Sequence, residues 1–452
     1  MRIPKPTTCL CLGLSLAPVA VLCYLLGVYA VDIPVWDEWG ILTLFEKYYQ
    51  GSLGFADFWQ QNNEHRLVLP RLFFLGLGLL TRYNVVYEMG CSVVLAALFW
   101  ALVARHVAKN RVVFGLERGW AWFLPAAALL VFSLRQHENW FWGFQLQWYQ
   151  NILAVAGGAY VFANCEIRPR TLVALAGCGL AALFSLSSGV LYWPLMLFFI
   201  LLRGKELGRA RTLGYAASWI LGASIILGFY LVDYRTPHYP GAHGQLLHVA
   251  SAYLHYVLLY CGNILSQIQD DGWFYAGVGL AGLGLFVGFF ITYARSADRV
   301  LFQRASFFLI LGAYGVGCAV LTGIGRLGYG VVQASSSRYA TMSMLLWLAT
   351  LFFLYARAWR PRGGKPLKLA AALLCALLVA GVSWRSATCV PYIRFASVTY
   401  SLGREALLTG QSDEALSGIT WAPDYLKTHA IPLFRRYRLS VFRDVPTPEP
   451  TP

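Results

Sequence analysis

Apolar stretches long enough to cross a lipid bilayer recur along the whole chain, and this feature restricts the fold more than any other. A membrane-spanning helix needs about 20 predominantly apolar residues. A transmembrane barrel would instead show alternating segments of about ten residues, which this sequence does not contain. Charged residues make up only 13% of the chain, against roughly a quarter in a soluble protein. The sequence therefore predicts an all-α, polytopic membrane protein.

We expect about 11 transmembrane helices. The first follows Arg2 and Lys5 and is not followed by a cleavage site, so we interpret it as a retained helix. The stretch 171–202 is uncharged and has basic residues on both sides, so we divide it at Ser187-Ser188-Gly189 into a hairpin of two short helices. The predicted spans are 9–31, 85–107, 119–134, 148–165, 171–187, 190–202, 213–232, 272–294, 305–325, 339–356 and 369–384.

Basic and acidic residues are divided unequally between the two sides that these spans create. With the N-terminus inside, the inside segments hold 20 of the 36 Lys and Arg but only four of the 21 Asp and Glu. This bias predicts a cytoplasmic N-terminus and a C-terminal tail on the opposite side. It also accounts for the net charge of +15 without a nucleic-acid partner. The absence of any Asn-x-Ser/Thr sequon fits the cytoplasmic (inner) membrane of a bacterium, with a periplasmic tail.

The predicted domains are a transmembrane domain over residues 1–385 and a small helical tail outside the membrane over residues 386–452. The last residues of the tail are rich in proline and are expected to be disordered. Two interfacial helices are expected on the same side as the tail. One covers 67–80 in the first outside loop, and the other covers 246–268 in the fourth.

Charged residues near a bilayer are costly, and they concentrate at functional sites. The run Trp36-Asp37-Glu38-Trp39 places two carboxylates directly after the first helix. A helix cap within an aromatic belt would explain one of these acids, but not both. His65 and Arg66 follow in the same loop, either as ordinary solvated charges or as residues that hold an anionic head group.

Two further outside loops carry candidate residues. His137 and Glu138 lie in the second loop, within a cluster of tryptophans that includes Trp140. Arg326 and Arg338 bracket the fifth loop, which is rich in glycine and serine. Such a loop lets backbone N–H groups approach a phosphate, and arginine adds a bidentate fork. The alternative is a flexible connection with a snorkelling arginine at each helix end.

These motifs resemble those of the GT-C superfamily of membrane glycosyltransferases, both in their order along the chain and in their predicted location on one side of the membrane. The resemblance covers the topology of most of the chain, and it rests on Asp37-Glu38, on the segment from Glu64 to Pro70 and on Glu138. The nearest similarity is to the protein O-mannosyltransferase and aminoarabinose-transferase branch. Members of that branch usually show a Lys/His-Pro-Pro-Leu segment, where this chain has His65-Arg66-Leu67-Val68-Leu69-Pro70.

The resemblance implies transfer of a sugar from a polyprenyl-phosphate donor to a glycolipid, glycan or protein acceptor on the non-cytoplasmic face. In this family the reaction is usually an inverting displacement at the anomeric carbon. Asp37 would act as the general base, and Glu38 and Glu138 would be further catalytic carboxylates. The implied substrate-binding residues are His65, Arg66, His137, Arg326, Arg338, Trp36 and Trp140. No nucleotide or fixed cofactor is implied, although a divalent metal would find suitable ligands in Asp37, Glu38, His65 and Glu138.

Two alternatives remain open. A lipid-linked-sugar flippase, a transporter or an assembly subunit would share the membrane topology without catalysis. A transporter is expected to carry charges near the middle of broken helices, whereas the predicted spans contain few charges and Glu88 lies near a span end. A pseudoenzyme or scaffold of the same fold would retain the architecture without activity.

Overall fold

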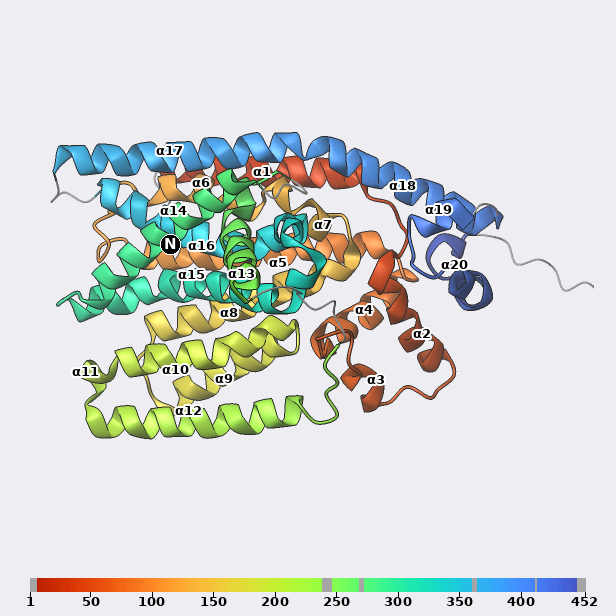
Figure 1. Ribbon diagram of the computed structural model, residues 1–452, viewed down its shortest axis with the longest axis horizontal. Helices are drawn as coiled ribbons and strands as arrows, with labels where there is room; N and C mark the ends of the chain where they lie inside the picture. Colours follow the sequence, from red (N-terminus) through yellow and green to blue (C-terminus); the bar gives the residue numbers. More distant parts are fainter. Residues whose placement is uncertain (1–5, 238–245, 268–271, 360–363, 411–412, 445–452) are drawn as a thin grey trace, which may run out of the picture.

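The computed structural model describes residues 6–237, 246–267, 272–359, 364–410 and 413–444. Over these residues the chain is helical and forms no β-strand, which confirms the predicted all-α class. Figure 1 shows that the longer helices run along the long axis of the molecule, while short helices gather at one end. Because helices satisfy their own backbone hydrogen bonds, this is an arrangement that a bilayer accepts.

Within the part of the chain that the structure describes, seven helices are long and apolar enough to cross a membrane, as expected for a multi-pass membrane protein. The last of them, α17, is followed end to end by α18 (Val390–Thr409), and Figure 1 shows this pair extending beyond the bundle. The seven are α1 (Pro6–Tyr29), α5 (Val85–Asn110), α12 (Arg209–Tyr230), α14 (Trp273–Ala294), α15 (Arg299–Arg326), α16 (Ala340–Trp359) and α17 (Lys365–Thr388).

The other four predicted spans also coincide with helices, but these are shorter or more polar. They are α6 (Phe123–Val131), α8 (Leu146–Asn164), α9 (Pro169–Leu183) and α10 (Tyr192–Leu202). The predicted span 119–134 is the least regular, because a 3-10 turn at Trp120–Trp122 precedes α6 and leaves only nine residues of α-helix. Among the described residues, length and composition therefore support seven spans by themselves, and not the predicted eleven.

The hairpin predicted at Ser187-Ser188-Gly189 is confirmed. A 3-10 turn over Ser187–Leu191 separates α9 from α10. At Gly189 a Cβ atom would lie 2.3 Å from the carbonyl carbon of Ala182, so only glycine permits the chain to turn this closely against α9.

The helix predicted in the fourth outside loop is α13 (Leu246–Gly262), and Figure 1 shows it crossing the direction of the long helices. Its backbone packs tightly against α14, because a Cβ atom at Gly279 would lie 1.9 Å from the carbonyl oxygen of Leu258. Residue 268, the predicted end of this helix, lies outside the described residues.

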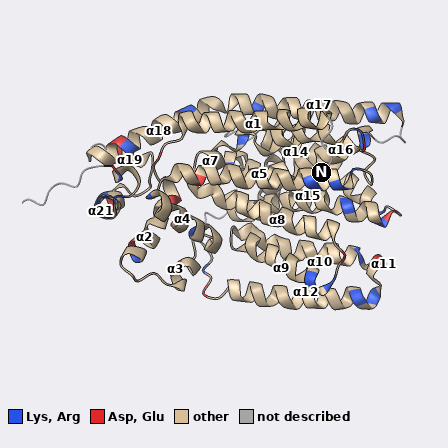
Figure 2. Cartoon of the chain, turned by 180° about the vertical axis from the view of Figure 1, so that it is seen from behind, with Lys and Arg blue, Asp and Glu red and all other residues tan. Residues whose placement is uncertain are grey.

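Charge distinguishes the two ends of the bundle (Figure 2). Lys and Arg gather at what we call the basic end, formed by residues 105–118, 165–170, 203–211 and 295–304. Here Arg203 and Arg304 donate to carbonyl groups in the last turn of α8, which have no partner within the helix, and Gln303 donates to the carbonyl of the residue that follows α8. The opposite end, which we call the acidic end, contains the first loop and the tail.

The first loop consists of four short elements at the acidic end. They are η1 (Trp36–Ile41), α2 (Leu42–Tyr49), α3 (Phe55–Trp59) and α4 (Val68–Thr81). The predicted interfacial helix 67–80 corresponds to α4, which is 14 residues long and too short to cross a bilayer unaided. Phe74 of α4 stacks on Phe144, with 5.7 Å between ring centroids, and this contact fixes the loop on the bundle.

The tail folds back onto the first loop through α19 (Asp413–Ser417), α20 (Pro423–Tyr425) and α21 (Ile431–Tyr437). The backbone N–H of Trp36 and the indole N–H of Trp39 both donate to the carbonyl oxygen of Ile419, at 2.8 and 3.0 Å. The predicted domain boundary at 385/386 falls inside α17, and the predicted disordered end lies outside the described residues.

Phe434 provides a test of this docking. Its side chain is fully buried, 5.7 Å from Trp39 and 5.9 Å from Tyr83 between ring centroids. We expect Phe434→Ala to lower the free energy of unfolding by about 3–5 kcal/mol, because it leaves a cavity in the contact between tail and loop. Thermal unfolding of the detergent-solubilised protein measures the loss. The matched control Phe395→Ala, at a 74% exposed position on α18, should change stability little, and equal losses in both variants would contradict the docking.

Candidate functional site

A cavity of about 1000 Å³ opens at the acidic end between the first loop, α12, α13 and the end of α15. One part is polar and is lined by Asp37, Asn62, Asn63, Glu64, His65, Arg326 and Arg338. Most of the remainder is apolar or aromatic, with Leu186, Val190, Leu227, Leu321, Ile324 and Met342 among its lining residues. The cavity therefore suits a ligand that carries both a charged group and a hydrocarbon chain.

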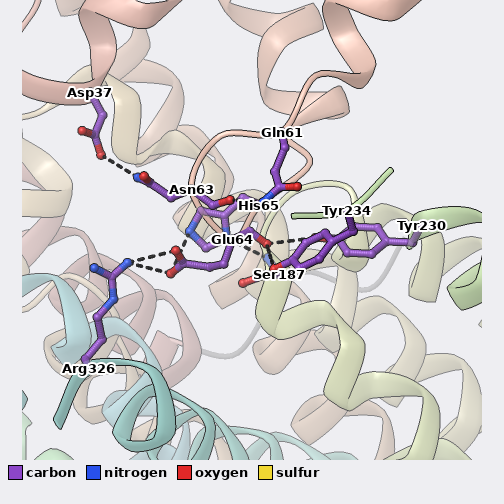
Figure 3. Close-up of polar contacts among 9 residues, drawn as sticks. All are labelled: Asp37, Gln61, Asn63, Glu64, His65, Ser187, Tyr230, Tyr234 and Arg326. Atoms are coloured by element: carbon purple, nitrogen blue, oxygen red, sulfur yellow. Dashed lines mark hydrogen bonds and ion pairs between the residues drawn. The ribbon is translucent and has the colours of Figure 1, made fainter. Parts of the chain in front are cut away.

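Asp37 projects from η1 toward this cavity, and its carboxylate accepts few hydrogen bonds (Figure 3). The Asn63 side chain donates to it at 3.5 Å, the outer limit for a hydrogen bond. Burial raises the pKa of Asp37, while Arg338, His65 and Arg326 act in the opposite direction. A carboxylate with raised pKa and few hydrogen bonds is well suited to accept a proton.

The backbone beside Asp37 is held in an unusual conformation. Trp36 has a φ of 52°, in the left-handed region that residues with a Cβ atom seldom adopt. Its ring packs 4.3 Å from that of Trp421, and its N–H donates to Ile419. These tail contacts offset the backbone strain and fix the direction in which Asp37 points.

Glu64, His65 and Arg326 form the second group in the cavity. Arg326 donates to both carboxylate oxygens of Glu64, at 2.7 and 3.0 Å. Ser187 donates its backbone N–H to Nδ1 of His65, so in the neutral ring the proton resides on Nε2, which lies 3.5 Å from Glu64. Burial lowers the pKa of His65, which favours this neutral form.

Arg338 enters the cavity from the fifth loop, just before α16. Glu138 accepts a hydrogen bond from its backbone N–H at 2.8 Å, and Ser337 donates its hydroxyl proton to the Arg135 carbonyl at 2.9 Å. The Asn139 amide donates to the Arg338 carbonyl. Glu138 thus acts on the placement of Arg338 and does not line the cavity itself.

Glu38 and Arg66, both predicted as site residues, point away from the cavity. Glu38 is 1% exposed, accepts a hydrogen bond from the Val35 N–H and faces Glu88, with Gly143 packed against both carboxyl groups. Arg66 donates to the carbonyls of Tyr230, Trp59 and Val232, which leaves its guanidinium committed to holding the first loop on α12. Adjacent residues in a 3-10 turn or a loop project in different directions, which explains both differences from the prediction.

Trp36, His137 and Trp140 also lie outside the cavity lining. Trp140 is fully buried and stacks on Tyr149. His137 is buried against Ser337, and burial lowers its pKa to about 4. Among the described residues, no group of three or more His, Cys, Asp or Glu could hold a metal ion, so the predicted ligand set is not assembled.

Glu64, Gln145 and Gln147 line the cavity but were not predicted as site residues. Glu64 begins the segment on which the family resemblance rests, yet no role had been assigned to it. Trp142, Gln145 and Gln147 line the cavity and are buried, yet Trp142 Nε1 and the two amide oxygens have no hydrogen-bond partner among the described residues. Buried polar atoms of this kind commonly contact a ligand or water. The glutamines at 145 and 147, polar within an apolar segment, were the available signal.

Comparison with known proteins gave no match to the chain, whether to a protein family, to a curated protein or to a solved structure. The site is therefore interpreted from its own geometry.

The buried carboxyl of Glu38 generates a prediction about pH. Burial raises its pKa to about 7 in the folded protein, from an ordinary value of 4.5. Between these values the folded state binds more protons than the unfolded state, so stability falls as the pH rises through this window. We expect Glu38→Gln to remove part of that fall, so that the variant gains stability relative to wild type at pH values above about 7. Thermal unfolding measured across this pH range tests the expectation, with Glu405→Gln on exposed α18 as control. Parallel curves for Glu38→Gln and wild type would contradict it.

Proposed function

We propose that the chain is an integral membrane glycosyltransferase that moves a sugar from a polyprenyl-phosphate donor to a glycolipid, glycan or protein acceptor. The observation that carries this proposal is the amphiphilic cavity, in which Asp37, Arg326 and Arg338 share one polar region beside an apolar one. A lipid-linked sugar phosphate has this same division between a charged group and a hydrocarbon chain. The GT-C-like order of the motifs supports the same function.

In the proposed reaction Asp37 accepts the proton of the acceptor hydroxyl as that oxygen attacks the anomeric carbon. The bond between the anomeric carbon and the phosphate oxygen breaks, and its electron pair remains on the polyprenyl phosphate. Arg338 and Arg326 stabilise the charge that develops on this leaving group. The buried polar atoms of Trp142, Gln145 and Gln147 are placed to contact sugar hydroxyl groups.

The site residues of the proposal follow from this geometry. Asp37 is the catalytic base, and Arg326, Arg338 and His65 are the substrate-binding residues in the cavity. Glu138 and His137 help to position Arg338, and Glu38 supports the turn that carries Asp37. A non-catalytic flippase or transporter would use the same cavity, but the charged groups lie at the acidic end rather than along the middle of the spans, which favours chemistry at the interface.

The proposed location is the inner membrane of a bacterium, with the basic end in the cytoplasm and the acidic end in the periplasm. The positive-inside bias supports this orientation. Two of the four acids assigned to the basic end are paired there, Glu166 with Arg168 and Glu206 with Arg203. Because the segments assigned to this side hold 20 Lys and Arg against four acids, an excess of positive charge remains to set the orientation.

Replacement of Asp37 tests the catalytic proposal. Asp37→Asn is close to isosteric, so the protein should fold while transfer activity falls by roughly 10²–10⁴-fold, the usual contribution of a general base. Mass spectrometry of envelope glycans and glycolipids, compared between cells with the wild-type gene, the variant and no gene, measures the loss. The matched control Asp424→Asn, on the exposed tail, should retain activity. An Asp37→Asn protein that restores the wild-type glycan profile would exclude Asp37 as the base.

Single-cysteine labelling tests the orientation. In a background without other cysteines, we expect Ser417→Cys to react with a membrane-impermeant maleimide in intact spheroplasts, because α19 lies at the acidic end. Native Cys165, which is exposed at the basic end, should react only after permeabilisation. The reverse pattern would invert the topology and place the cavity in the cytoplasm.

A further inference from the structure

The two arginines of the cavity differ in how their charge is compensated. Arg326 donates two hydrogen bonds to Glu64, whereas Arg338 has no ion pair within 4.0 Å among the residues that the structure describes. His65 adds no charge in its neutral form. The positive charge of Arg326 is therefore largely cancelled before any ligand enters. Arg338 interacts with the carboxylates of Asp37 and Glu138 only at longer range, so it is the less compensated of the two cations.

Glu64 is held rigidly in this position (Figure 3). Its backbone carbonyl accepts hydrogen bonds from the hydroxyl groups of Tyr230 and Tyr234, at 3.2 and 3.3 Å. On either side, Asn62 and His65 exchange two backbone hydrogen bonds of 2.8 Å. With its backbone fixed in this way and both carboxylate oxygens bonded to Arg326, Glu64 keeps its negative charge at the cavity wall when an anion approaches.

The proposed reaction changes the charge of the phosphate that faces this wall. In the donor, the phosphate is a diester with one negative charge. When the sugar leaves, the phosphate becomes a monoester with a charge of about −1.5 to −2 at neutral pH. The fixed carboxylate of Glu64 repels the monoester more strongly than the diester, because the Coulomb energy is proportional to the charge.

We propose, resting on the proposed function, that Glu64 sets the charge selectivity of the cavity: it favours the singly charged diester donor over the doubly charged monoester product. The Glu64 carboxylate keeps Arg326 directed into the cavity. It also prevents Arg326 and Arg338 from binding the monoester tightly between them. Release of the polyprenyl phosphate after transfer follows from the same repulsion. Glu64 is a specificity-determining residue in this role.

Binding of three lipids to the full-length protein in detergent tests this proposal. The probes are undecaprenol, undecaprenyl phosphate and the methyl diester of undecaprenyl phosphate, which share one hydrocarbon chain and differ in charge. We expect Glu64→Gln to bind the monoester roughly tenfold more tightly and the diester roughly threefold more tightly, because the effect on the logarithm of affinity doubles with the ligand charge. The ratio of monoester to diester affinity should therefore rise about threefold, while undecaprenol binding is unchanged.

Two further variants make the test independent of how well Glu64→Gln folds. Asn63→Asp adds a negative charge at the same cavity wall and should lower the ratio, since aspartate tolerates the left-handed conformation of Asn63. Glu405→Gln removes one charge from exposed α18 and should leave the ratio unchanged.

The outcomes separate the two proposals. An unchanged or lowered ratio in Glu64→Gln would overturn the role of Glu64 while leaving the glycosyltransferase proposal intact. If the wild-type protein binds neither phosphate more tightly than undecaprenol, the cavity does not recognise lipid phosphate, and both proposals fall. A ratio that rises in Glu64→Gln and falls in Asn63→Asp supports the charge selectivity.

Discussion

Buried side-chain donors satisfy the backbone carbonyls of the loops at the acidic end, and the site depends on these hydrogen bonds. A loop carbonyl has no helical partner, and its burial without a donor is costly. Arg135 donates to Ser266 and Ser335, and Asn263 donates to Ala334 and Ser336. The second, fourth and fifth loops are thereby joined into one unit behind the cavity. Arg338 follows directly in sequence, so its position is determined by three segments and not by its own helix alone.

The helices could be predicted because the length of an apolar run is a local property of the sequence. The spans 85–107, 213–232 and 272–294 agree closely with α5, α12 and α14. The short apolar stretches within the first and fourth loops likewise located α4 and α13. The docking of the tail could not be predicted, since Trp39 and Ile419 are 380 residues apart and neither carries a signal for the other. Contacts at such separation depend on how all intervening helices pack.

In the candidate site, too, local features could be predicted from the sequence and contacts between distant residues could not. Sequence reasoning assigned Asp37, His65, Arg326 and Arg338 to one outside face, and the structure brings all four to one cavity. It also assigned Glu38 and Arg66, because a sequence motif indicates which loop a residue belongs to but not which way its side chain points. The ion pair between Glu64 and Arg326 could not be predicted from the sequence, since 262 residues separate the partners.

The contact of Trp36 and Trp39 with Ile419 has a consequence for biogenesis. The turn that carries Asp37 is synthesised well before its support, because 380 residues separate Trp39 from Ile419. Contacts between distant segments form late, because the intervening chain must first be ordered. The strained backbone at Trp36 consequently lacks its hydrogen bond to the tail until the segment with Ile419 has been synthesised and has docked. The direction of Asp37 is thus fixed only once the tail has docked, and maturation of the site is coupled to synthesis of the segment that carries Ile419.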